Sequence, residues 1–316
     1  MVPHSTDSNR PWRTPMKHNY GGVLIYVLLL LAMLSSLLSV AFQNSTNNTR
    51  LLAASLLHTE ARQMALSGLD LIIYELKRDG RNSNTDNMQD RWYSYTYGRN
   101  FPIEGGNIFI QIQDAAAVPS LNQVIGYASS DEPYQEMLRR YTSNANLPSF
   151  NLDPVIDYID ADNETRSSGA EAWDYAGEDI PFIPRNDYIE GYADFALIQG
   201  IPEKLKRKAY QHFSLIPGAM EVNVNIASPH LLKAALTSAE GLDQAIKSRS
   251  RAPYESLSEF LKEVGLKKAP NILSFGVSTE YFTVRSEVRY NEAYVGLEAL
   301  IWRDELNFKV LKINWL

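Results

Sequence analysis

The stretch "HNYGGVLIYVLLLLAMLSSLLSVAFQNS", residues 18–45, decides the fold of this chain. Between His18 and Arg50 there is no Asp, Glu, Lys or Arg. Val23 to Phe42 is an apolar run of about twenty residues, and a helix of that length, rising about 1.5 Å per residue, crosses a hydrocarbon core about 30 Å thick. The run therefore predicts a transmembrane helix over residues 23–42.

Basic residues precede this helix, at Arg10, Arg13 and Lys17. Cytoplasmic flanks of membrane helices carry an excess of Lys and Arg. We therefore expect the N-terminus in the cytoplasm and residues 43–316 on the other side of the membrane.

The sequence leaves the fate of the apolar segment open. A signal peptidase could cut after Ala41, because Ser39-Val40-Ala41 is a small-x-small pattern, and the product would be a secreted protein such as a hydrolase. The run is, however, longer than the 7–15 apolar residues typical of a signal peptide. The other interpretations are an uncleaved anchor and a segment that is trimmed at its N-terminal side and retained.

The segment after the polar patch "QNSTNNT" has the pattern of an amphipathic helix. Asp79-Gly80 supplies a stop signal at its end. Together with the apolar run this predicts one long helix, half in lipid and half packed on a soluble domain. Apolar residues recur at steps of three or four: Leu57, Ala61, Ala65, Leu69, Ile72 and Leu76.

Strand patterns lie on both sides of a long helical region. "NIFIQIQ" (107–113) alternates apolar and mostly polar residues, and three further strand candidates close the chain, with Asn291 and Asp304 near the turns. From about 118 to 275 helical patterns dominate. We therefore expect an α+β fold: a long N-terminal helix on an antiparallel sheet, interrupted by a large α-helical insertion. The closing candidates are "EYFTVRSEVRY" (280–290), "AYVGLEALIW" (293–302) and "NFKVLKINW" (307–315).

An acidic loop is the main candidate metal site. Residues 153–179 hold nine carboxylates against one arginine, Arg166. Four of the carboxylates occupy the first, third, fifth and twelfth positions of a calcium-binding loop. The sixth position is Thr165, where an EF-hand needs Gly, so a true EF-hand is not expected. The four are Asp160, Asp162, Glu164 and Glu171, with Asp174 and Glu178 as further candidate ligands. The alternative is a solvated loop whose aspartates cap helices.

The charge balance argues against general nucleic-acid binding. The net charge is −7 and the pI about 5.4, whereas such proteins need a basic surface. "LIQGIP" (197–202) and "VNVNIASPHLLKAAL" (222–236) have some character of helix-hairpin-helix units, so a membrane-tethered DNA-binding or DNA-uptake protein is the alternative function. In the second segment we expect Asn223 and Asn225 to satisfy backbone groups at a turn, and Ser228-Pro229 to begin a helix.

Catalytic patterns are missing from the sequence, and we expect no enzyme and no catalytic residues. There is no cysteine, which excludes disulfides, thiolate metal sites and a thiol nucleophile. The five histidines (4, 18, 58, 212 and 230) lack ligand spacing, and no nucleophile elbow, phosphate loop or dinucleotide fingerprint is present.

Gly21 and Gly22 immediately before the apolar run resemble the leader of the type IV pilin class. In that class a membrane prepilin peptidase cuts on the cytoplasmic side of the segment, and Gly lets the backbone approach the protease. The cut would fall at Gly21/Gly22 or Gly22/Val23, followed by methylation of the new N-terminus, and Met1 and Met16 are both possible starts. Most pilins carry Glu at mature position five, but here that residue is Tyr26 or Val27. A carboxylate in the membrane costs about 2.5–3.5 kcal/mol unless paired, so a subunit without one needs no neighbour ahead of it.

Further blocks resemble one family in the right order: general secretion pathway protein K, the minor pseudopilins of type II secretion systems. With residues 21–80 they cover most of the chain. The blocks are "DAAAVPSLNQV" (114–124), "DPVIDYIDADNETRSSGAEAWDY" (153–175), "DFALIQGIPEKL" (194–205), "VNVNIASPHLLKAAL" (222–236), "STEYFTVRSEVR" (278–289) and "LEALIWRD" (297–304).

The resemblance implies a protein of the bacterial inner membrane, with the bulk of the chain in the periplasm. It would form a tip complex with two other minor pseudopilins, above the major pseudopilin, and would meet prepilin peptidase and the inner-membrane secretion platform. It also implies calcium in the helical insertion. The membrane helix would pack on neighbouring filament helices through Tyr26, Val27, Leu30 and Leu34. The implied domains are a removed leader (1–22), the membrane half-helix (23–42), the first part of a pilin-like domain (43–117), the insertion (118–276) and the last pilin-like strands (277–316).

Overall fold

The computed structural model describes residues 20–81, 84–125, 132–147, 150–177, 182–305 and 307–316. The chain divides into two compact units, Met1–Leu56 and Leu57–Leu316.

The long helix predicted from the sequence is confirmed as α1, Tyr20–Asp79. Its polar patch is helical too, and there the hydroxyls of Thr46 and Thr49 donate to the carbonyls of Phe42 and Ser45 one turn earlier, both at 2.9 Å. In the first unit the large apolar side chains are exposed, from 46% at Val27 to 75% at Phe42. Within the described residues, α1 is the helix long and apolar enough to cross a membrane, with a mean hydropathy of 2.6 in its most apolar window.

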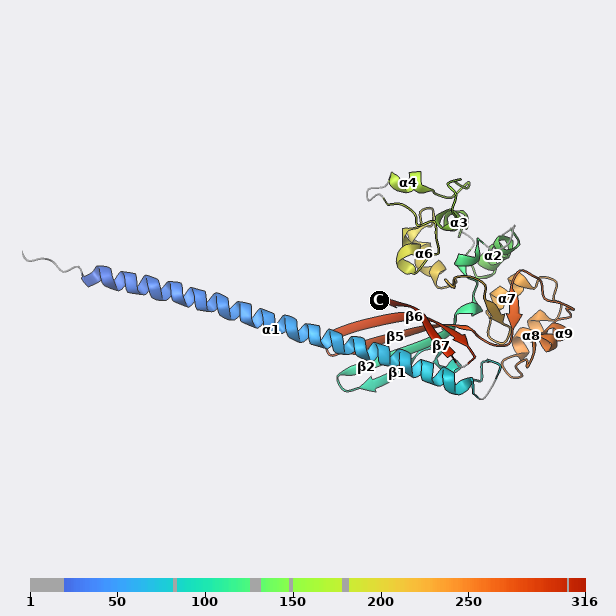
Figure 1. The fold of residues 1–316 in the computed structure, drawn as a ribbon, viewed down its shortest axis with the longest axis horizontal. Coiled ribbons are helices and arrows are strands. Elements are labelled where there is room, and N and C mark those ends of the chain that lie inside the picture. Colours follow the sequence, from blue (N-terminus) through green and yellow to red (C-terminus); the bar gives the residue numbers. More distant parts are fainter. Residues whose placement is uncertain (1–19, 82–83, 126–131, 148–149, 178–181, 306) are drawn as a thin grey trace, which may run out of the picture. The chain divides into compact units, whose positions relative to one another are not determined.

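The second unit is built on a five-stranded antiparallel sheet in the order β1-β2-β5-β6-β7 (Figure 1). The last part of α1 packs on this sheet, and most of its expected stripe is buried: Ala61, Ala65, Leu69, Ile72 and Leu76 all belong to one core, whereas Leu57 is only partly buried. Gly68 lets the helix approach β5 closely, since a Cβ there would lie 2.4 Å from Ser286 Oγ. The strands are β1 (Arg99–Ile103), β2 (Gly106–Asp114), β5 (Tyr281–Tyr290), β6 (Ala293–Asp304) and β7 (Asn307–Trp315).

The helical insertion lies between two strands that are neighbours in the sheet. β2 and β5 pair directly, from Gly106 opposite Tyr290 to Asp114 opposite Phe282. The intervening residues form a second hydrophobic core. The described helices of the insertion are α2 (Glu132–Asn144), α3 (Asp153–Ile159), α4 (Ala172–Ala176), α5 (Tyr192–Leu197), α6 (Glu203–Tyr210), α7 (Pro229–Ala235), α8 (Leu242–Ser248) and α9 (Leu257–Glu263), with short 3-10 turns η2 (Ala115–Ala117) and η3 (Leu121–Gln123).

Two features of the sheets were not expected. The edge strand β1 was not predicted, because "RNFPI" contains a proline and lacks apolar alternation. The insertion also contains a small parallel pair, β3 (Glu221–Asn223) and β4 (Ser274–Gly276), in a region where we expected helices. The predicted boundaries of the leader, membrane, pilin-like and insertion segments remain predictions.

The insertion leaves and rejoins the sheet at the end where α1 stops. After α1, the backbone N–H of Asp86 donates to the carbonyl of Val277 at 2.9 Å, in the connection between β4 and β5. A 3-10 turn, η1 (Trp92–Tyr95), follows, and its buried Trp92 packs edge-on against Phe282 of β5 at 5.2 Å between ring centroids. The C-terminal end of α1 and both ends of the insertion therefore share one region of the second unit.

Candidate functional site

The acidic loop between α3 and α4 brings three of its carboxylates together. Asp160 ends α3, and Glu171 is the residue before α4. One carboxylate oxygen from each of Asp160, Asp162 and Glu171 lies within 4.8 Å of the others. The first, third and twelfth positions of the expected loop thus converge.

Two other predicted ligands lie outside this group. Glu164 is exposed, and its backbone N–H donates to Asp162 Oδ1 at 2.8 Å. Asp174 Oδ2 accepts the backbone N–H of Glu171 at 2.8 Å, so this carboxylate caps α4. Glu178 lies outside the described residues.

Sequence reasoning missed Asp157, which is fully buried beside the group. Its Oδ2 accepts the backbone N–H of Arg166 at 3.0 Å, which closes the loop on itself. A Cβ at Gly169 would lie 1.8 Å from the same oxygen, so the loop needs glycine there. An aspartate inside the otherwise apolar run "PVIDYI" (154–159) was the available signal.

The charge in this region is not balanced by protein groups. Arg166 Nη1 donates to Asp157 Oδ1 at 2.7 Å and to Asp160 Oδ2 at 2.6 Å. Both carboxylate oxygens of Glu171 and Oδ1 of Asp160 are buried without a hydrogen-bond partner. Leaving a buried polar group unpaired costs about 1–3 kcal/mol, and more for a charged one.

The pKa values respond to this imbalance. Burial, followed by repulsion from Asp160, Asp157 and Asp162, raises the pKa of Glu171 to about 7. Burial also raises the pKa of Asp160, against the opposing effect of Arg166. A hard divalent cation held by carboxylate oxygens at about 2.3–2.6 Å would relieve both effects, so the residues fit calcium.

The segments with helix-hairpin-helix character make structural contacts. Asn223 Oδ1 accepts the N–H of Asn225 at 2.9 Å, and Asn225 exchanges two hydrogen bonds with the backbone of Tyr254. Ser228 Oγ accepts the N–H of Leu231 at 3.1 Å and caps α7. The prediction that these side chains satisfy backbone groups and begin a helix is confirmed.

Three of the four basic side chains of α6 make contacts within the fold. Lys206 and Lys208 donate to the carbonyls of Ala196 and Asn146, and Arg207 lies over the ring of Tyr192. These contacts occupy cations that the DNA-binding alternative would need for phosphates.

The predicted processing and filament residues lie at the start of α1. A Cβ at Gly22 would meet nothing within 4 Å, and Val23 is exposed. Tyr26, Val27, Leu30 and Leu34 are all exposed as well. The surroundings of Gly21, within α1, are not described.

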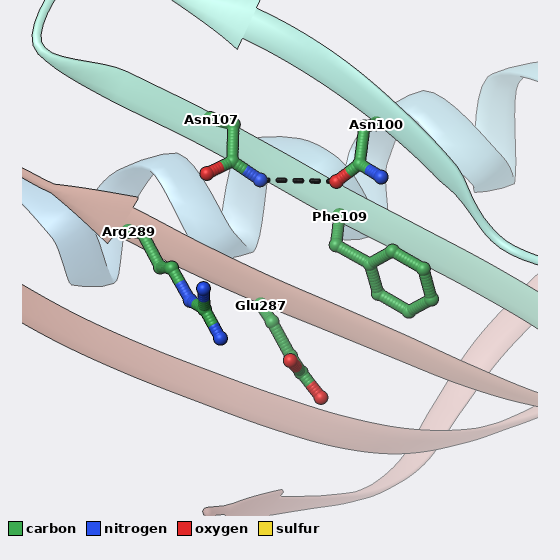
Figure 2. Close-up of a pocket in the computed structure, with 5 residues that line it drawn as sticks. All are labelled: Asn100, Asn107, Phe109, Glu287 and Arg289. Atoms are coloured by element: carbon green, nitrogen blue, oxygen red, sulfur yellow. Dashed lines mark hydrogen bonds between the residues drawn. The ribbon is translucent and has the colours of Figure 1, made fainter.

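A shallow hollow of about 250 Å³ lies on β1, β2 and β5 (Figure 2). Its lining consists of two amides, a phenyl ring, one carboxylate and one guanidinium, and Asn107 Nδ2 donates to Asn100 Oδ1 at 3.0 Å. This lining contains no nucleophile with an adjacent base. The residues are Asn100, Asn107, Phe109, Glu287 and Arg289.

The comparisons with known proteins agree with the resemblance seen in the sequence. The family described as "Type II secretion system (T2SS), protein K" matches residues 118–218, within the insertion. "Type II secretion system protein K" of Pectobacterium carotovorum subsp. carotovorum is 27% identical over 296 residues, which cover 86% of this chain and 89% of that protein. The protein of the same name from Klebsiella pneumoniae is 25% identical and covers 94% of this chain and 97% of its own length.

A solved structure has the same fold. A chain in the crystal structure of the GspK-GspI-GspJ complex from the enterotoxigenic Escherichia coli type 2 secretion system aligns with a TM-score of 0.69 at 20% identity. The alignment covers 83% of this chain and 98% of that one. The expected α+β architecture, with a long N-terminal helix, an antiparallel sheet and additional helices, is thereby confirmed. Part of the insertion, residues 118–218, therefore matches the type II secretion system protein K family, and most of the chain is similar to proteins of that name.

Proposed function

We propose that this chain caps the tip of the type II secretion pseudopilus and, in doing so, helps to start filament assembly and the export of folded proteins across the outer membrane. The observation that carries the proposal is the place of the insertion in the fold. A complete helical domain with its own core is built into the connection between the adjacent strands β2 and β5, at the end of the sheet where α1 stops. A domain at that end would obstruct the place of a further subunit.

The membrane half of α1 supports the same position. It offers Tyr26 or Val27 where most pilins have a membrane-embedded glutamate, so no buried acid demands the N-terminal amine of a subunit ahead. Its exposed apolar side chains, including Leu30 and Leu34, would pack on helices of the subunits below. The subunit would sit in the inner membrane with residues 43–316 in the periplasm.

The partners follow from the similar complex. The matched crystal structure contains GspK together with GspI and GspJ. We propose two corresponding minor pseudopilins as partners here, with the major pseudopilin below them and the inner-membrane platform as the assembly site. The chain would act by assembly and not as an enzyme.

Labelling a single cysteine tests the tip position. The chain has no cysteine, so Trp173→Cys introduces a unique thiol at a side chain that is 87% exposed on α4. Gold coupled to this thiol is expected at one end of isolated pseudopili, with the cysteine-free chain as the unlabelled control. Gold spread along the filament shaft would contradict tip capping.

Prepilin peptidase processing is tested at the paired glycines. Changing Gly21 and Gly22 together to Leu should leave an uncleaved precursor and impair secretion, because the bulky side chains keep the backbone from the protease. Changing Ser39 and Ala41 to Leu removes the signal-peptidase pattern and should leave maturation unchanged. A mature protein of normal size from the glycine variant, or loss of maturation in the control, counts against this processing.

We further propose that Asp160, Asp162 and Glu171 bind calcium, supported by their convergence and by the unpartnered oxygens of Asp160 and Glu171. A ligand at a hundred times its dissociation constant stabilises a protein by about 2.7 kcal/mol. Because Glu171→Gln removes the charge of a proposed ligand, it should gain less unfolding free energy from calcium than the matched control Glu164→Gln, whose side chain is exposed. Equal gains in the two variants would exclude this site.

Removing calcium should also expose a pH dependence. The folded-state pKa of Glu171 is raised to about 7 from 4.5, so its stabilising contribution is complete below about pH 4.5 and is lost as the pH rises towards 7. In chelator the wild type should lose more stability than Glu171→Gln between pH 4.5 and 7. Parallel curves of stability against pH for the two proteins would show that folding does not raise the pKa of Glu171.

A further inference from the structure

A second group of carboxylates surrounds the C-terminal end of α1. Asp79 is the last residue of that helix, Asp86 lies in the loop after it, and Asp90 precedes η1. One carboxylate oxygen of each lies within 4.8 Å of the others. Calcium, with ligand distances of about 2.3–2.6 Å, can bridge such a spread.

Asp86 provides an independent sign of a missing ligand. The residue is 2% exposed, and its Oδ2 accepts the N–H of Thr279 at 2.7 Å and a hydrogen bond from Arg303. Its Oδ1 is buried and has no hydrogen-bond partner. Protein groups supply donors only to the other oxygen of Asp86, so Oδ1 is left for a ligand from outside the chain.

The surrounding charges leave the group negative. Arg303 pairs with Asp86 and offsets one of the three carboxylates. Nε of Arg91, the residue after Asp90, lies 3.1 Å from Oε2 of Glu75, so this guanidinium is paired with Glu75. The buried carboxylate of Asp114 accepts a hydrogen bond from the hydroxyl of Thr279. The C-terminal end of α1 adds the negative end of the helix dipole.

The titration behaviour agrees with this charge count. Burial and repulsion from Asp90 and Asp86 raise the pKa of Asp79 to about 7. Burial raises the pKa of Asp90, and Asp86 adds to the effect.

We propose that Asp79, Asp86 and Asp90 form a second divalent-cation site, of the calcium class, that clamps the end of the membrane helix to the loop after it. The three side chains supply only hard oxygen ligands, which suit such an ion. The site shares no residue with the acidic loop between α3 and α4, so it stands independently of the calcium proposed there.

The position of Asp86 gives this ion a structural role. Its backbone N–H donates to the carbonyl of Val277, and its own carbonyl accepts from Asn223 Nδ2, both at 2.9 Å. Val277 lies directly after β4, in the connection that leads to β5, and Asn223 lies in β3 of the insertion. An ion on Asp86 would therefore link the end of α1 to the residues where the insertion rejoins the sheet. It would fix the position of the insertion relative to the end of the helix.

Counting bound ions tests the proposal. The full chain in detergent is dialysed against radioactive calcium, and bound calcium is measured per chain. Asp90→Asn keeps an oxygen that can still accept the N–H of Asn87, so the fold should be retained while one ligand charge is lost. The matched control is Asp70→Asn, an exposed aspartate of the same helix.

Asp90→Asn should bind one calcium fewer than the wild type, and Asp70→Asn should bind the wild-type number. A wild-type count in Asp90→Asn overturns the second site. Glu171→Gln tests the second site without changing Asp79, Asp86 or Asp90. If the second site exists, this variant still binds one calcium ion, and if it does not exist, the variant binds none. If the acidic loop between α3 and α4 binds no calcium, the wild type and Glu171→Gln both bind one ion, so failure of the two proposals is distinguishable.

Discussion

The two parts of α1 differ in whether their apolar side chains are exposed or buried. From Val23 to Phe42 the apolar side chains are exposed around the whole helix. From Ala61 to Leu76 they form one stripe, which is buried against the sheet. A helix that is apolar all round needs lipid or neighbouring helices, whereas a striped helix needs a single partner face. One helix therefore has the length and apolar surface to cross a membrane in one part, and is a structural element of a folded domain in the other.

The largest expected difference comes from the same truncation made in each part. Ile72→Ala removes a fully buried side chain from the core and should lower the free energy of unfolding by about 2–5 kcal/mol, because a cavity remains. Ile25→Ala changes a side chain that is 60% exposed and should stay within about 0.5 kcal/mol of wild type. Denaturant unfolding of the full chain in detergent, followed by tryptophan fluorescence, measures both. Similar losses for the two variants would remove the distinction between the parts.

A charge in the apolar part should act on membrane insertion instead of folding. Leu30→Arg lies near the middle of the predicted transmembrane helix, where an arginine costs about 2.5–3.5 kcal/mol. The fraction of chains that resist carbonate extraction should fall. Tyr74→Arg places the same charge on the exposed face of the packed part and should leave that fraction unchanged. Full membrane retention of Leu30→Arg would show that residues 23–42 do not span the bilayer.

The smallest expected effect concerns a cation–π contact of the packed part of α1. Arg62 lies over the ring of Trp315 at the end of β7, 3.9 Å from its centroid. Arg62→Gln should cost about 0.5–1 kcal/mol of stability through loss of the cation–π contact. In a double-mutant cycle with Trp315→Leu, the two losses should be less than additive. Full additivity would mean that the two side chains do not interact.

Elements with strong local patterns were predicted well from the sequence. The extent of α1, its stop at Asp79 and the strands β2, β5, β6 and β7 all follow from apolar spacing and turn residues. The strand β1 was missed because an edge strand can tolerate Pro102 and needs no regular apolar alternation. The pair β3–β4 was missed because each strand has only three residues.

The candidate sites were predicted less completely. The spacing of the acidic loop identified Asp160, Asp162 and Glu171, but it also indicated Glu164, whose side chain is exposed outside the group. It did not indicate Asp157, which lies on α3 and forms an ion pair with Arg166. The group of Asp79, Asp86 and Asp90 has no recognisable spacing at all.

Patterns repeated over a few residues were enough to predict the long apolar helix, the antiparallel sheet and the separate helical region from the sequence. Only the tertiary structure decided which carboxylates share a small volume and which buried oxygens lack a donor. Those properties depend on chain reversals and on side chains far away in sequence, such as Thr279 and Arg303 beside Asp86. Spacing along the chain does not encode such distances, because they are set by the packing of the whole domain.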